Sequence, residues 1–201
     1  MLHIPNPAQA LVRAITGRIF SAFVLLVACV ALAGSIVFLG LDVAAHHVAS
    51  RMRAPHLQSL PQPAPDLIYR TLDGRQQHLL PTNRQVVFLD LWGTWCIQCV
   101  AEMPTVQKLY DHYRNDPQVK FLIVSRLDSP ARVRLYARHN HFDLPFFVTH
   151  DDEIPASMQL GQFPETFILS KNGDLVAHHL GAADWSDPSV TTFIDHLKTQ
   201  Q

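Results

Sequence analysis

In QVVFLDLWGTWCIQC, residues 85–99, an apolar run leads through a short turn to two cysteines. The run VVFLDLW has no clean alternation of polar and apolar side chains, which is typical of a strand with both faces covered. Cys96 and Cys99 then open a helix that we expect to reach about Arg114. Dithiol chemistry needs this arrangement, because the N-terminus of a helix lowers the pKa of the first cysteine.

A CxxC pair can also be half of a zinc site or a purely structural disulfide. Zinc would need two more ligands, but Cys29 lies in an apolar run and the pairs His178-His179 and His139/His141 would have to reach across the fold. A disulfide that closes so short a loop restrains little unfolded chain. Electron transfer is the remaining interpretation, and we expect no metal at the pair.

Each cysteine has a separate role in this interpretation. Cys96, at the helix N-terminus, is the expected attacking thiolate, and Cys99, covered by the helix, resolves the mixed disulfide.

Strands and helices alternate after residue 64, which predicts an α/β sheet with crossover helices. The segment 85–92 is the expected central strand. Around it we expect hairpins over 66–80 and 166–180 that turn at Asp73-Gly74 and Asn172-Gly173, strands over 119–125 and 144–150, and helices over 129–140 and 187–201.

Residues 64–200 resemble the thioredoxin superfamily, and within it the membrane-anchored TlpA/ResA/DsbE-type thiol:disulfide oxidoreductases of the bacterial envelope. The resemblance rests on FLDLWGTWCIQCVAEMP, VSRLD, LGQFPETFILSKNGDLVAHHLG and ADWSDPSVTTFIDHL, which occur in the family order. It implies a thioredoxin-like α/β fold with a central mixed β-sheet flanked by helices. It also implies a redox-active Cys96-Cys99 disulfide in a reductase that passes electrons from a membrane donor to disulfides outside the cytoplasm, without a cofactor.

The resemblance also assigns roles to residues around the pair. Pro164 occupies the place of the family's cis-proline, so Phe163-Pro164 is the candidate cis bond. The backbone ahead of such a proline can pair with an extended client strand, which makes Trp95, Phe163 and Pro164 the expected substrate-binding residues. Pro104 matches a proline that kinks the active-site helix, and the end of the helix is the alternative interpretation.

Two carboxyl groups near the cysteines are expected to govern how the thiols titrate. Asp90 lies in the apolar strand, where a carboxylate is costly unless it is protonated or hydrogen-bonded, so we expect it to accept a proton from Cys99. Glu102 shares the helix face of Cys99 and matches a glutamate of ResA-like proteins. The alternatives are a solvated aspartate at a strand end and an ordinary surface glutamate. Negative groups disfavour thiolates, which favours a reducing protein over an oxidant.

The segment from Ile19 to Leu41 contains no charged side chain and is long enough to cross a hydrocarbon core of about 30 Å. A cleaved signal peptide is the rival interpretation, with ALA at 31–33 as the cleavage site, but the apolar residues continue past it. The proline-rich stretch that follows is typical of an extended tether. We therefore expect a short cytoplasmic segment over 1–18, a transmembrane anchor over 19–41, a linker over 42–63 and a thioredoxin-like domain over 64–201.

The charges that flank the apolar segment give only a mild preference for orientation. Arg13 and Arg18 on one side are matched by Arg51 and Arg53 on the other. The resemblance implies a single-pass protein of the inner (cytoplasmic) membrane whose catalytic domain faces the periplasm. The expected partners are client proteins with disulfides in the periplasm, a membrane electron donor and, through the N-terminal helix, the membrane itself. Apocytochrome c maturation, rescue of oxidised envelope proteins and copper-site assembly are all open as pathways.

Composition excludes some partners and leaves other functions open. With 16 basic and 17 acidic residues and no basic block, nucleic acid is not an expected partner. The 12 histidines leave open a thioredoxin-fold copper chaperone or metallochaperone helper, although they are scattered and Sco-type chaperones use a wider CxxxC pair. A peroxiredoxin is a third possibility, because APDLIYRTLDG opens many such chains. The sequence lacks the PxxxTxxC loop of that class.

Overall fold

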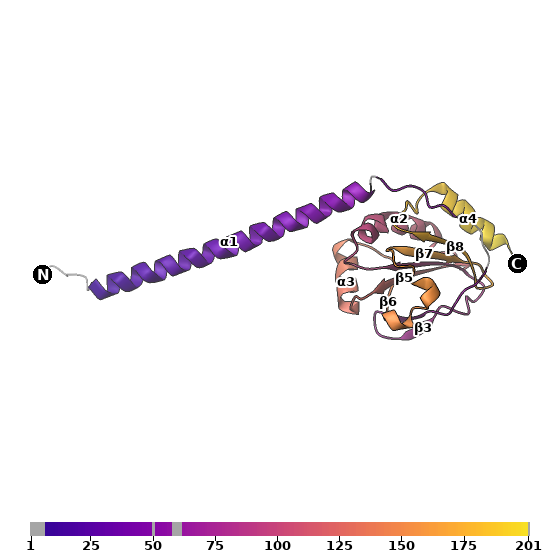
Figure 1. Ribbon diagram of the computed structural model, residues 1–201, viewed down its shortest axis with the longest axis horizontal. Coiled ribbons are helices and arrows are strands. Elements are labelled where there is room, and N and C mark those ends of the chain that lie inside the picture. The colour runs from indigo at the N-terminus through magenta and orange to yellow at the C-terminus, as the bar shows by residue number, and fades with distance from the viewer. Residues whose placement is uncertain (1–6, 50, 58–61, 201) are drawn as a thin grey trace. The chain divides into compact units, whose positions relative to one another are not determined.

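The computed structural model describes residues 7–49, 51–57 and 62–200 (Figure 1). The elements in chain order are α1 (Pro7–Ala49), β1 (Gln62–Pro63), β2 (Ile68–Thr71), β3 (Gln76–His78), β4 (Val86–Trp92), α2 (Ile97–Tyr113), β5 (Val119–Arg126), α3 (Pro130–His139), β6 (Phe146–Thr149), the 3-10 turns η1 (Asp151–Glu153) and η2 (Ala156–Met158), β7 (Glu165–Leu169), β8 (Asp174–Leu180) and α4 (Pro188–Thr199).

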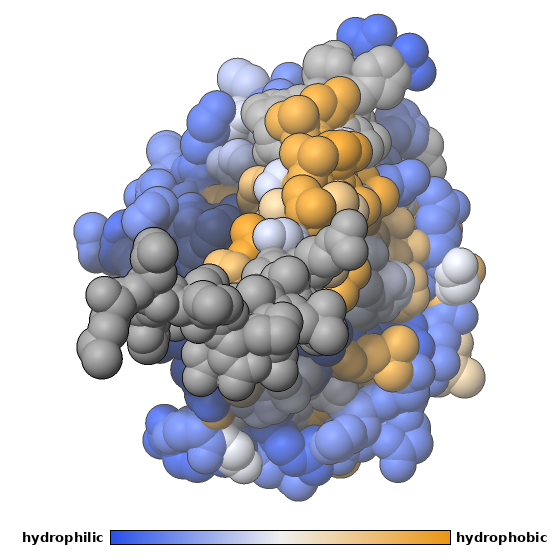
Figure 2. All heavy atoms as spheres, turned by 90° about the vertical axis from the view of Figure 1, so that its left-hand side faces the viewer, coloured by the Kyte–Doolittle hydropathy of each residue, from blue (hydrophilic) through white to orange (hydrophobic). Residues whose placement is uncertain are grey.

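The chain divides into two compact units, Met1–Ala44 and Ala45–Gln201. Within the described residues, one helix is long and apolar enough to cross a membrane, over Phe20–Gly40 of α1 with a mean hydropathy of 2.8. Its large apolar side chains are exposed, as the orange spheres of Figure 2 show. The helix continues to Ala49, into the segment expected to be a linker. The sequence DVAAHHVA over 42–49 explains this extension, because it contains neither proline nor glycine and is rich in alanine.

Eight strands of the described chain form one mixed sheet, in the order β1-β8-β7-β4-β5-β6-β2-β3. Strand β4 pairs in parallel with β5 and antiparallel with β7, and all seven of its residues are buried. This confirms the expectation of a central strand with both faces covered. The hairpins turn as expected, with φ of 93° at Gly74 and 87° at Gly173, values that glycine adopts without strain.

The two faces of the sheet carry separate apolar cores. Alternate residues of β4 enter each core, as the side-chain period of a strand requires. On one face the buried residues include Phe88 and Trp92 of β4, Met103 of α2, Val133 of α3 and Ile194 of α4. On the other face they include Leu89 and Leu91 of β4, Leu67, Leu79 and Met158. All three helices of the domain therefore pack on the first face, which is also the face of Asp90.

The helices of the domain begin where the sequence provides caps. The Ser129 hydroxyl accepts a hydrogen bond from the backbone N–H of Arg132 at 3.3 Å, and the Asp187 carboxylate accepts one from Ser189 at 2.9 Å. Pro104 lies inside α2, so the helix does not end there.

Parts of the expected linker are attached to the domain. Gln62 and Pro63 form β1, which pairs with Leu175 and Asp174 at the edge of the sheet. Proline is tolerated there because an edge strand does not need all its N–H donors. Nearer α1, the Arg53 carbonyl accepts a hydrogen bond from the Asp184 N–H at 2.8 Å. The boundary near residue 64 stays a prediction.

Packing between β4 and the helix face predicts a large cost for truncating Phe88. Its ring is fully buried and lies 5.2 Å from the Phe121 ring and 5.0 Å from the Trp185 ring, centroid to centroid. We expect Phe88→Ala to lower the free energy of unfolding of the full chain in detergent by about 3–5 kcal/mol, measured by urea denaturation. Leu135→Ala, at a side chain exposed on α3, is the control and should change it by about 0.5 kcal/mol or less. Equal losses in both variants would contradict the assignment of Phe88 to the core.

Candidate redox site

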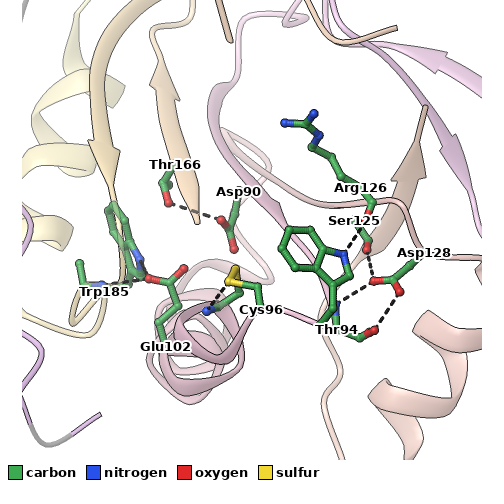
Figure 3. The surroundings of a disulfide bond; sticks show 12 residues. Asp90, Thr94, Cys96, Glu102, Ser125, Arg126, Asp128, Thr166 and Trp185 are labelled. Atoms are coloured by element: carbon green, nitrogen blue, oxygen red, sulfur yellow. Dashed lines mark hydrogen bonds between the residues drawn. A yellow bond between two sulfur atoms is a disulfide. The ribbon is translucent and has the colours of Figure 1, made fainter. Parts of the chain in front are cut away.

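The two cysteines lie at the N-terminus of α2 and form a disulfide (Figure 3). Cys96 is the N-cap residue, and its sulfur accepts a hydrogen bond from the Cys99 N–H at 3.1 Å. Cys96 keeps an exposed fraction of 8%, whereas Cys99 has none. The sulfur nearer solvent is therefore that of the predicted nucleophile, and the predicted resolving sulfur is enclosed.

An aspartate that the sequence analysis did not single out holds the turn before Cys96. The Asp128 carboxylate accepts hydrogen bonds from the Thr94 N–H and hydroxyl, both at 2.8 Å, and from the Ser125 hydroxyl at 2.7 Å. Figure 3 shows these three contacts. The signal was present in VSRLD, where a carboxylate follows an apolar strand, but the sequence does not show which backbone it would reach.

Glycine is required at position 93 because the indole of Trp95 lies against it. A Cβ atom at Gly93 would lie 2.4 Å from the Trp95 Nε1 atom, closer than any side-chain contact allows. The same Nε1 donates a hydrogen bond to the Arg126 carbonyl at 3.3 Å. Trp95 is thus fixed in place while 46% of its surface stays exposed next to Cys96.

The Phe163-Pro164 peptide bond is cis, as expected. The Phe163 ring meets the Trp95 ring edge to face, with centroids 5.2 Å apart. Pro164 is held from the other side, because its carbonyl accepts the Gly181 N–H at 2.9 Å. The structure therefore brings Phe163, and with it Pro164, to Trp95, the residue before Cys96. The Leu80-Pro81 bond is also cis, which the sequence did not indicate.

Asp90 is fully buried in β4, which excludes a solvated strand-end aspartate. Its Oδ1 atom accepts a hydrogen bond from the Thr166 hydroxyl at 3.4 Å, and within the described residues its Oδ2 atom has no partner. Burial raises the pKa of Asp90 to about 7, and the Thr166 hydrogen bond opposes that rise. Near neutral pH this carboxyl group can both bind and release a proton.

Glu102 is also fully buried, which excludes the surface alternative. Its Oε2 atom accepts hydrogen bonds from the Trp185 indole at 2.8 Å and from the Ala183 N–H at 3.0 Å. Burial, followed by the charge of Asp90, raises the pKa of Glu102 well above its ordinary value, and the two donors oppose that rise. Among the described residues its Oε1 atom has no partner.

The two carboxyl groups and the disulfide form one buried cluster. Figure 3 shows both carboxyl groups turned toward the space beside the sulfur atoms, Asp90 from the sheet and Glu102 from α2. Like charges in a buried space disfavour double ionisation, so the pair retains a proton more readily than either acid would alone in water. A proton held there is placed for transfer to or from a cysteine sulfur. The part of the chain that the structure describes holds no group of three or more His, Cys, Asp or Glu side chains placed to bind a metal ion.

Comparison with known proteins agrees with this geometry. The sequence pattern of the AhpC/TSA family matches residues 60–178. The chain belongs to this family. It is 33% identical over 110 residues to the thiol-disulfide oxidoreductase ResA of Geobacillus thermodenitrificans, which covers 55% of this chain and 63% of that protein. It is also 33% identical over 122 residues to the thioredoxin-like protein YneN of Bacillus subtilis, covering 60% of this chain and 71% of that protein.

The fold has the same relatives. A crystal structure of a candidate thiol-disulfide oxidoreductase from Bacteroides vulgatus superposes with a TM-score of 0.60 at 27% identity, covering 69% of this chain and 96% of that one. The thioredoxin-like α/β fold and the resemblance to ResA-type proteins are thereby confirmed. The match spans less than two thirds of the length of the Geobacillus relative.

The pKa of Asp90 predicts how its removal changes stability with pH. The folded state keeps the Asp90 proton up to about pH 7, whereas an ordinary aspartate releases it near 3.8. Stability is therefore lost as the pH rises between these values, and the full cost is present above pH 7. We expect Asp90→Asn, in the oxidised full chain, to raise the free energy of unfolding at pH 8 by up to about 4 kcal/mol and to give no gain near pH 4.

Denaturant unfolding at both pH values measures this difference. Asp152→Asn is the control, because Asp152 is an exposed carboxyl group in η1 and should give no such pH-dependent gain. A gain of equal size for Asp90→Asn at pH 4 and pH 8 would show that the effect does not come from titration of Asp90.

Proposed function

We propose that this chain is a thiol:disulfide oxidoreductase that reduces disulfides of client proteins through the Cys96/Cys99 pair. The observation that carries the proposal is the position of the pair: Cys96 with 8% exposure at a helix N-terminus, an enclosed Cys99, and the cis Phe163-Pro164 bond whose Phe163 ring contacts Trp95. The names of the ResA and YneN relatives support the same chemistry.

The reaction runs in two thiol exchanges from the reduced protein. The Cys96 thiolate attacks one sulfur of a client disulfide, which forms a mixed disulfide and releases the other client sulfur as a thiolate that takes up a proton. The Cys99 thiolate then attacks Cys96, which releases the second client sulfur and forms the Cys96-Cys99 disulfide. Two electrons pass to the client, and a dithiol donor must return two electrons before the next cycle.

Asp90 and Glu102 supply the proton chemistry of the second step. Cys99 is enclosed, so its proton needs an acceptor inside the protein, and the two carboxyl groups lie next to the pair. Their negative charge also disfavours thiolates. A dithiol form that is not stabilised as a thiolate gives up its electrons readily, which favours reduction of clients over oxidation.

Anchoring and location are a further part of the proposal. The chain is a single-pass protein of the cytoplasmic membrane, with α1 as its anchor and the redox domain in the periplasm. The length and hydropathy of Phe20–Gly40 support the anchor. The location follows from the chemistry, because client disulfides persist outside the cytoplasm and are reduced inside it. Electrons then come from a dithiol donor in the same membrane.

Reduction of insulin tests the activity. We expect the full chain in detergent, supplied with dithiothreitol, to accelerate insulin precipitation, and Cys96→Ser to fall to the uncatalysed rate because the attacking sulfur is gone. Cys29→Ser is the matched control and should keep full activity, since Cys29 is a free cysteine in α1, in the other compact unit of the chain. A Cys96→Ser variant as active as the unmodified chain would show that Cys96 is not the nucleophile. Faster consumption of hydrogen peroxide than of insulin disulfide would favour a peroxidase instead.

Trapping in cells tests the clients and the location. Cys99→Ser in the full-length protein should accumulate mixed disulfides with its clients, because serine cannot resolve the bond to Cys96. Electrophoresis without reductant, followed by mass spectrometry of the reduced adducts, identifies the trapped proteins. The adducts should come from the periplasm and be absent from the Cys96→Ser/Cys99→Ser double variant. Adducts with cytosolic proteins alone would show that the proposed topology is inverted.

A further inference from the structure

Arg126, the last residue of β5, contacts both Trp95 and Phe163, two of the predicted substrate-binding residues. Its backbone carbonyl accepts the hydrogen bond from the Trp95 indole at 3.3 Å. Its guanidinium lies over the Phe163 ring, with Cζ 4.8 Å from the ring centroid. Since the Phe163 and Trp95 rings also touch, these three residues form a closed set of contacts ahead of Pro164.

The Arg126 side chain forms an ion pair with the Asp151 carboxylate. Its Nε atom donates a hydrogen bond to the Asp151 Oδ1 atom at 2.9 Å. The side chain is only 10% exposed, whereas that of Asp151 is 46% exposed. A guanidinium that is largely shielded from water interacts more strongly with an aromatic ring than an exposed one does. The ion pair with Asp151 fixes the plane of the guanidinium over Phe163.

The loop that leads to the cis-proline, residues 160–164, is also held by Glu165. The Glu165 Oε1 atom accepts hydrogen bonds from the N–H groups of Leu160 and Gly161, both at 3.0 Å. Glu165 is buried, and the positive charge of Arg126 is among the effects that oppose the rise of its pKa on burial. The loop is therefore fixed at its start by Glu165 and at Phe163 by Arg126. Neither contact involves the sulfur atoms or the Asp90 and Glu102 carboxyl groups.

We propose that Arg126 is a positioning residue that holds Phe163 and the backbone ahead of Pro164 in the form that receives an extended polypeptide, and so makes the site selective for protein disulfides over small ones. The proposal rests on the proposed disulfide reductase activity and specifies its substrate class. A client polypeptide must align its backbone along the residues ahead of Pro164 so that its disulfide meets Cys96. If Phe163 and that backbone are loosely held, the alignment is weaker. A small disulfide needs only access to the Cys96 sulfur.

The test compares two substrates in the full chain in detergent with dithiothreitol as the reductant. For Arg126→Met, which removes the charge and keeps much of the side-chain length, we expect KM for insulin to rise about 10-fold, with kcat within about twofold. The rate with 2-hydroxyethyl disulfide should stay within about twofold of the unmodified chain. Arg126→Lys should recover part of the loss, because an ammonium group can lie over the same ring.

Two further variants keep the test decisive if Arg126→Met fails to fold. Asp151→Asn leaves Arg126 in place but weakens its anchor, so it should raise KM for insulin in the same direction by a smaller factor. Arg138→Met removes an exposed arginine from α3 and should change neither the KM for insulin nor the rate with 2-hydroxyethyl disulfide.

The outcomes separate this inference from the proposed activity. An unmodified chain that reduces neither substrate would overturn the proposed function itself. An active chain whose Arg126→Met and Asp151→Asn variants keep the insulin KM would overturn the role of Arg126 alone. Equal losses with insulin and 2-hydroxyethyl disulfide would overturn it too, since they would indicate general damage to the site.

Discussion

Strand β4 is covered on both faces, and this enclosure determines the positions of the helices and the cysteines around it. Each face of this strand enters a different apolar core, so its register against β5 and β7 has no freedom to slip. The strand ends at Trp92, and the chain leaves the sheet through a short turn over 93–95 before α2 begins at Ile97. The rigid strand thus sets where the helix starts. Because Cys96 is the N-cap of that helix, the redox pair takes its position from the most buried element of the protein.

The same enclosure determines the chemistry of the acids. Asp90 points to the helix face of β4, where Glu102 of α2 must also find room, and each has an oxygen without a partner among the described residues. A carboxylate in such surroundings destabilises the folded state above its pKa. A neutral group of the same shape at position 90 would remove this cost, whereas Glu102 also satisfies the Trp185 indole and the Ala183 N–H. The acids are therefore a local cost to folding that is concentrated beside the disulfide, which is where a proton acceptor is useful.

The sequence was sufficient for the features that depend on local pattern. The central strand, the glycine turns at Gly74 and Gly173 and the helix start at Ser129 follow from periodicity and cap residues, and the cis bond at Pro164 from the family resemblance. Contacts that join distant segments could not be predicted in this way. Asp128 binds Thr94, Trp185 binds Glu102 and Arg126 lies over Phe163 only because the sheet order and the helix packing bring them together. No spacing in the chain encodes those distances. The extension of α1 to Ala49 is a different case. Residues 42–49 favour a helix by composition, but the proline-rich sequence after them led to the prediction of a linker from residue 42.

The contacts around the disulfide fall into two groups that share few residues. On one side, Asp90 and Glu102 lie beside the sulfur atoms, with Trp185 bound to Glu102, and these acids are the proposed proton acceptors for Cys99. On the other side, Trp95, Phe163 and Arg126 contact one another next to Cys96, which is less enclosed than Cys99. Residues that are far apart and share no partners make nearly independent contributions to the free energy. We therefore expect a substitution at Trp95, Phe163 or Arg126 to change which disulfides bind while the proposed proton chemistry of resolution is retained, because the two groups meet only at the cysteines.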